Sequence, residues 1–143
     1  MLESLISECL KQGRSVRFHA PGRSMHPTIR ESEPVIVEPV SSSALAVGDI
    51  VLSQSGEKIT AHRLIGIDYE PAVASRQAAD RRPRFITRGD ACSVCDSPSG
   101  PEHLLGKVIA VERKGRRINP CGFFPSLYTR TYRLLSRLLR PFH

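Results

Sequence analysis

Short runs of Val, Ile and Phe, separated by Gly, Pro, Ser and Asp, follow one another from residue 15 onward and constrain the fold most strongly. This pattern is typical of β-strands bounded by turns. Before these runs, apolar residues recur at helical spacing over residues 2–12 and stop at Gly13, which predicts a short amphipathic helix. The sequence therefore predicts a mainly β body behind an N-terminal helix. The predicted strands are Val16–Ala20, Val35–Glu38, Asp49–Gln54, Lys58–Ile67, Arg84–Thr87 and Leu105–Arg113.

The length of 143 residues is enough for one domain with a core and too short for two. We expect three parts: an N-terminal helix over 1–14, a β domain over 15–118, and a C-terminal segment over 119–143. Within the β domain, residues 68–83 are polar and nearly free of large apolar side chains, which predicts a mobile insertion.

Positive charge is concentrated at the C-terminal end. The net charge is +7, and residues 107–143 hold 9 Lys/Arg against a single acid. Over residues 126–140 a stripe of Leu lies beside four Arg and no acid, which predicts a basic amphipathic helix. Such a helix can lie on a membrane surface. The same pattern fits equally well a helix that docks its stripe on its own domain and exposes its arginines.

Composition and patterning exclude several classes of protein. No stretch approaches the ~18 uninterrupted apolar residues of a spanning helix, and the N-terminus lacks the basic and apolar regions of a secretory signal. We therefore expect a cytoplasmic or peripherally membrane-associated protein. Aromatic residues make up only 6% of the chain and Trp is absent. With no helix-turn-helix pattern before the body, nucleic acid is not an expected partner.

The cysteines Cys9, Cys92, Cys95 and Cys121 are too few and too unevenly spaced for a secreted disulfide framework, which favours a reducing compartment. Cys92 and Cys95 form one CxxC pair. With His103 and Cys121 as scattered further candidates, this is a weak zinc signal, and a local disulfide is the alternative. We expect no metal and no cofactor.

Three segments carry candidate catalytic residues. Ser24 follows Gly22, which permits an unusual backbone angle before it. His62 falls in a predicted strand, and Asp90 and Asp96 follow another. A positioned imidazole can take the proton of a serine, and a carboxylate can hold the second ring nitrogen. Taken singly, these residues also fit a turn serine, a surface histidine and loop-capping aspartates.

Taken in order, the segments form a specific set. Gly-x-Ser-Met-x-Pro is followed by Gly-Asp-Ile-Val, by His-Arg, by Thr-Arg-Gly-Asp with a second Asp six residues later, and by Gly-Lys-Val. Over roughly residues 15–113 the chain resembles the signal peptidase I superfamily, which also contains the LexA-type self-cleaving repressors. It is most similar to the archaeal and endoplasmic-reticulum type, because His62 stands where the bacterial type has a lysine. The matching residues are Gly22–Pro27, Gly48–Val51, His62–Arg63, Thr87–Asp90, Asp96 and Gly106–Val108.

The resemblance implies a strongly bent β-sheet body and a serine endopeptidase that processes signal peptides. It makes Ser24 the nucleophile and His62 the general base. Asp96 and Asp90 match the two loop aspartates, one of which supports the histidine, and we favour Asp96. A substrate would bind as an added extended strand. Lys58 and His26 are other candidate bases, but the motif supports His62.

The chain departs from that family in two respects. We expect no N-terminal transmembrane anchor, and Cys92 and Cys95 stand where the family has small polar residues. The alternative function is therefore a non-catalytic, peptidase-like module that its basic C-terminal helix recruits to a membrane or another anionic partner. The presence of all four candidate catalytic residues favours an active enzyme.

Overall fold

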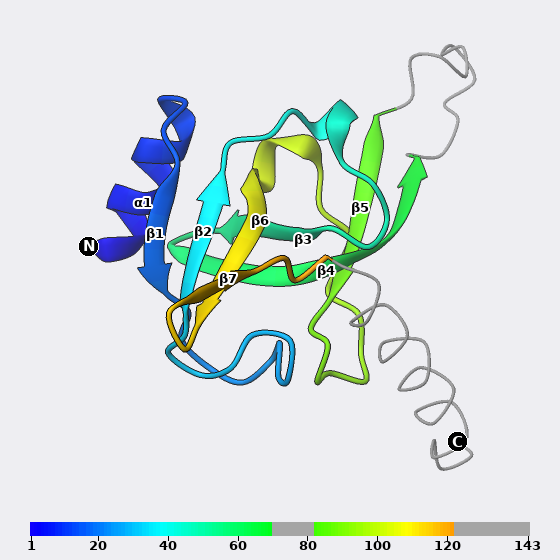
Figure 1. Cartoon of the computed structure of the whole chain (residues 1–143). Helices are drawn as coiled ribbons and strands as arrows, with labels where there is room; N and C mark the ends of the chain where they lie inside the picture. Colours follow the sequence, from blue (N-terminus) through cyan, green and yellow to red (C-terminus); the bar gives the residue numbers. More distant parts are fainter. Residues whose placement is uncertain (70–81, 122–143) are drawn as a thin grey trace, which may run out of the picture.

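The computed structural model describes residues 1–69 and 82–121. Over these residues the chain is mainly β, with one antiparallel sheet and a short N-terminal helix that packs beside β1 (Figure 1). The predicted helix over 126–140 and most of the predicted insertion over 68–83 lie outside the described residues. None of the described helices is long and apolar enough to cross a membrane.

Helix and strands fall where the sequence predicts them, within a few residues. β4 runs two residues into the predicted insertion, and β7 is a strand that the sequence patterns did not indicate. The elements are α1 (Leu2–Lys11), β1 (Val16–His19), β2 (Pro34–Glu38), η1 (Ser42–Ala44), β3 (Ile50–Ser55), β4 (Lys58–Tyr69), β5 (Pro83–Arg88), η3 (Pro101–His103), β6 (Leu104–Arg113) and β7 (Arg116–Ile118).

The strand order is β1-β2-β6-β3-β4-β5, and β7 pairs with β6. β6 is thus inserted between strands that lie far from it in sequence. The pairing register shifts at Ile36/Val37, at Leu52/Ser53 and at Leu64/Gly66. Such bulges bend a strand and increase the local twist. In Figure 1, β3 and β4 accordingly run at a steep angle to β1 and β2.

Both faces of the central strands are packed. Ile50 and Leu52 of β3 belong to the larger apolar cluster, onto which α1 packs Ile6 and Leu10. Val51, between them in sequence, faces the other side and belongs to a second cluster with Leu64 and Phe85. Alternate side chains of a strand point to opposite faces, so the continuous apolar run of β3 fits a strand that is buried on both.

Candidate active site

Ser24 lies on the loop between β1 and β2. Gly22, two residues earlier, has φ of +81°, the left-handed conformation that favours glycine and that the sequence predicted at this turn. Met25, which follows Ser24, is buried in the main core, and so is Ile29. The backbone N–H of Ile29 donates to the Met25 carbonyl at 3.0 Å. Two buried side chains therefore fix the loop, while Ser24 itself stays half-buried.

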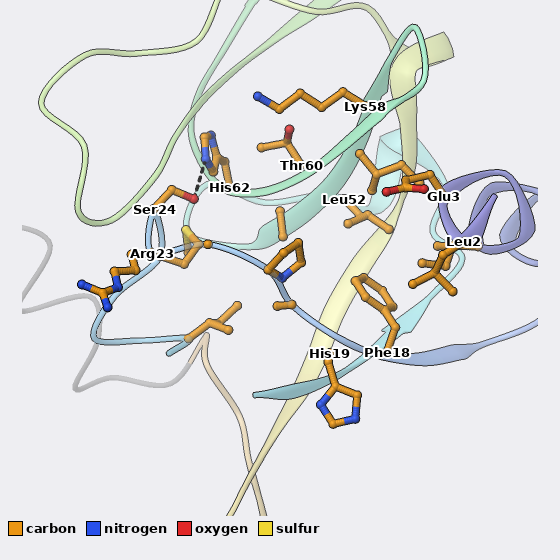
Figure 2. A pocket seen from close by; sticks show the side chains of 18 residues that line it. Leu2, Glu3, Phe18, His19, Arg23, Ser24, Leu52, Lys58, Thr60 and His62 are labelled. Atoms are coloured by element: carbon orange, nitrogen blue, oxygen red, sulfur yellow. Dashed lines mark hydrogen bonds between the residues drawn. The ribbon is translucent and has the colours of Figure 1, made fainter. Parts of the chain in front are cut away.

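His62 lies on β4, opposite Val51 of β3, with only 10% of its side chain exposed. Its Nε2 atom is 3.1 Å from the Oγ atom of Ser24 (Figure 2). This is hydrogen-bond distance, and it satisfies the first geometric requirement for a base that takes a serine proton.

Asp96 contacts the other nitrogen of the same ring. The distance from His62 Nδ1 to Asp96 Oδ2 is 2.5 Å. When Nδ1 carries the ring proton and donates it to this carboxylate, Nε2 is left as the acceptor for the Ser24 hydroxyl. The structure thus brings Ser24, His62 and Asp96 into one continuous chain of contacts.

Thr87 positions Asp96, a role that the sequence analysis did not assign to it. Its hydroxyl donates to Asp96 Oδ2 at 2.7 Å, and its carbonyl accepts the Asp96 backbone N–H at 2.9 Å. Thr87 is buried at the end of β5. In the sequence, the place of Thr87 in the Thr-Arg-Gly-Asp stretch could have indicated this role. Because Asp96 is 41% exposed, these two bonds hold the carboxylate in place where burial does not.

Asp90, the other predicted loop aspartate, lies in a separate buried pair. It accepts two hydrogen bonds from Arg63, at 2.8 and 2.7 Å, and one from the Thr28 hydroxyl at 2.6 Å. Arg63 also donates to the Gly48 carbonyl at 2.8 Å. The side chains of Arg63 and Asp90 are only 4% and 1% exposed. The geometry therefore gives Asp90 a role in holding the loop and leaves the contact with His62 to Asp96.

The loop after β5 packs tightly against Ser24. The Ala91 backbone N–H donates to the Ser24 carbonyl at 2.9 Å. A Cβ atom on Gly89 would lie 2.5 Å from that same carbonyl oxygen and 3.1 Å from His62 Nε2. It would also lie 2.8 Å from Cys92 Sγ, which places this thiol beside the site. Because these atoms lie so close to the backbone of residue 89, only glycine fits there without displacing them.

A groove of about 620 Å³ begins at Ser24 and His62 and extends toward α1. Figure 2 shows Ser24 and His62 at one side of it and Leu2, Glu3 and Phe18 at the other. Ile6 and Leu52 add to its apolar wall. Five consecutive residues of β4, Lys58 to His62, also line it. An elongated groove with mixed apolar and polar walls has the form that an extended peptide fits.

The candidate zinc ligands are dispersed. His103 Nδ1 bonds to the Gln54 carbonyl at 3.0 Å, and Cys121 packs against the main core. Burial raises the pKa of the Cys121 thiol, which disfavours the thiolate that binds metal. Within residues 1–69 and 82–121, no three His, Cys, Asp or Glu side chains are grouped to hold a metal ion.

Neither the family models nor the curated proteins give a match to this chain.

Proposed function

We propose that the protein is a serine endopeptidase of the signal peptidase I type, with Ser24 as nucleophile and His62 as general base. The observation that carries the proposal is the chain of contacts from Ser24 Oγ through His62 to Asp96 at one end of an elongated groove. The sequence resemblance gives it independent support, because it singled out these residues by their order along the chain.

The reaction follows from the roles of the three side chains. Ser24 Oγ attacks the carbonyl carbon of the scissile bond, and its proton passes to His62 Nε2. Asp96 stabilises the imidazolium through the Nδ1 hydrogen bond. As the tetrahedral intermediate collapses, Nε2 returns the proton to the leaving amine. Water, activated by the same imidazole, then releases the acyl group from Ser24.

The backbone N–H of Ser24 is the natural donor to the oxyanion of that intermediate. The substrate would lie along β4 as an extended strand, since β5 pairs with β4 only from Arg63 onward. We also propose that the sheet is the strongly bent sheet of the signal peptidase fold.

Active-site labelling tests this proposal directly. A peptidyl phosphonate forms a stable bond to a nucleophilic serine, and intact mass spectrometry counts the adduct. Wild type should gain one adduct, and Ser24→Ala and His62→Ala should gain none. Ser43→Ala, at an exposed serine of η1, is the matched control and should label like wild type. An adduct that persists in folded Ser24→Ala protein would refute the proposed nucleophile.

For the basic segment we propose peripheral contact with anionic membranes through residues 126–140, on the evidence of its sequence alone. Flotation with phosphatidylserine-containing liposomes should depend on these residues. Equal flotation of the full chain and a chain ending at residue 125 would instead favour a segment docked on its own domain.

A further inference from the structure

Of the described residues that line the groove, Lys58 is the cation without an ion pair. Among the described residues, two Lys or Arg side chains line it: Lys58 and Arg23. Arg23 is engaged, with its Nε atom 2.9 Å from Glu31. Lys58 is exposed and has no ion pair within the part of the chain that the structure describes. Figure 2 shows its side chain running along the groove on the same side as Thr60 and His62.

The strand geometry relates Lys58 to the reacting atoms. Lys58, Thr60 and His62 alternate along β4, so their side chains share one face. Between Lys58 and His62 the strand pairs with β3 on one edge, and no described strand pairs with its other edge. An extended peptide added to that free edge advances at about the rise of β4, so four residues separate the positions facing His62 and Lys58, or about 13 Å.

We infer that Lys58 selects a substrate with an Asp or Glu side chain about four residues from the scissile bond. This inference rests on the proposed peptidase function and assigns that site a charge preference. A lysine ammonium is a compact charge with three donors, and it is not neutralised by a neighbour here. Glu3 also lines the groove, but its Oε2 atom lies 3.5 Å from the N-terminal ammonium, and the remaining wall on that side is apolar and carries no charge preference.

The expected preference is modest because Lys58 is exposed. Ion pairs of this kind favour a carboxylate over a neutral side chain about two- to five-fold. That difference is large enough to measure as a ratio of kcat/KM between a peptide with Glu and its Gln counterpart.

Cleavage of a proteome-derived peptide library, read by mass spectrometry, tests the inference. Wild-type products should be enriched in Asp and Glu three to five residues from the cleaved bond, on one side of it. Lys58→Gln should lose that enrichment, and Lys58→Glu should replace it with Lys and Arg. Lys114→Glu is the matched control, because it makes the same change of charge at an exposed turn between β6 and β7, away from the groove lining.

The outcomes distinguish a failure of the Lys58 charge preference from a failure of the proposed peptidase activity. Library cleavage that Ser24→Ala abolishes, with one residue profile common to wild type and Lys58→Glu, overturns the role of Lys58 and leaves the peptidase intact. An equal change of profile in Lys114→Glu also overturns it, because net charge would then explain the effect. If wild type cleaves nothing beyond the Ser24→Ala background, the peptidase proposal fails and the inference fails with it.

Discussion

The side chain of Arg63 donates two hydrogen bonds to Asp90, while the preceding residue on β4 contacts Asp96. Neighbouring residues of one strand point to opposite faces, so His62 and Arg63 each engage a different aspartate of the same loop. The loop is held at two points, and the two aspartates have different environments. One is 41% exposed beside the imidazole, and the other is 1% exposed against the guanidinium. This difference predicts different consequences when each is changed.

Replacement of Asp96 should affect reactivity and leave the fold nearly unchanged. Asp96→Asn keeps the shape of the side chain but removes the charge that orients the His62 ring and stabilises its protonated form. In serine peptidases this change lowers kcat by up to about 10⁴-fold. The rate of labelling by the phosphonate should fall steeply, with thermal unfolding close to wild type. An unchanged labelling rate would show that Asp96 does not contribute to the reactivity of Ser24.

Replacement of Asp90 should affect stability first. Asp90→Ala leaves the buried Arg63 guanidinium without its carboxylate, and breaking such a pair costs about 3–5 kcal/mol of the free energy of unfolding. Urea denaturation measures it. The double variant Arg63→Met/Asp90→Leu removes both charges and should be more stable than Asp90→Ala. A small effect of Asp90→Ala would contradict the structural role that we assign to the pair.

A substitution at Gly89 tests how tightly the loop after β5 packs on Ser24. A Cβ atom there would lie 2.5 Å from the Ser24 carbonyl oxygen, so Gly89→Ala should displace the loop and slow labelling. Forced overpacking of this kind costs about 1–3 kcal/mol of stability. Gly66→Ala on β4 is the matched control, since its nearest neighbours lie 3.8 Å and 4.0 Å away. Equal labelling rates for the two variants would contradict the close approach.

Much of this arrangement follows from local sequence. Helical spacing gave α1, and Val/Ile-rich runs between turn residues gave the positions of the strands. The aspartate that contacts His62 was favoured only through the resemblance, because two carboxylates six residues apart look alike in sequence. Their difference comes from Arg63, which reaches Asp90 from β4, and from Thr87 of β5, which holds Asp96 in the loop that follows the same strand. The β4–β5 pairing also contains the register shift at Leu64/Gly66, which no periodicity in the sequence predicted. β7 was missed because its three residues, all exposed, carry no apolar pattern.

The loop that carries Ser24 is held by an ion pair that acid should weaken. Arg113 of β6 contacts Glu33 through Nε and Nη2, both at 2.7 Å, and Nη2 also reaches the carbonyls of Pro27 and Thr28. The hydrogen bonds from Arg113 hold the pKa of the Glu33 carboxyl below its usual value. A depressed pKa means that this carboxylate stabilises the fold above its unfolded pKa, near 4.3, and that the contribution is lost as the pH falls through the folded value.

Glu33→Gln should therefore be less stable than wild type at pH 7, and the difference should shrink as the pH falls below the usual range of a glutamate. Urea denaturation at a series of pH values measures that difference. Glu57→Gln, at the exposed turn between β3 and β4, is the matched control and should differ little from wild type throughout. A Glu33→Gln deficit that stays constant down to pH 2 would mean that the carboxylate charge is not what braces the loop.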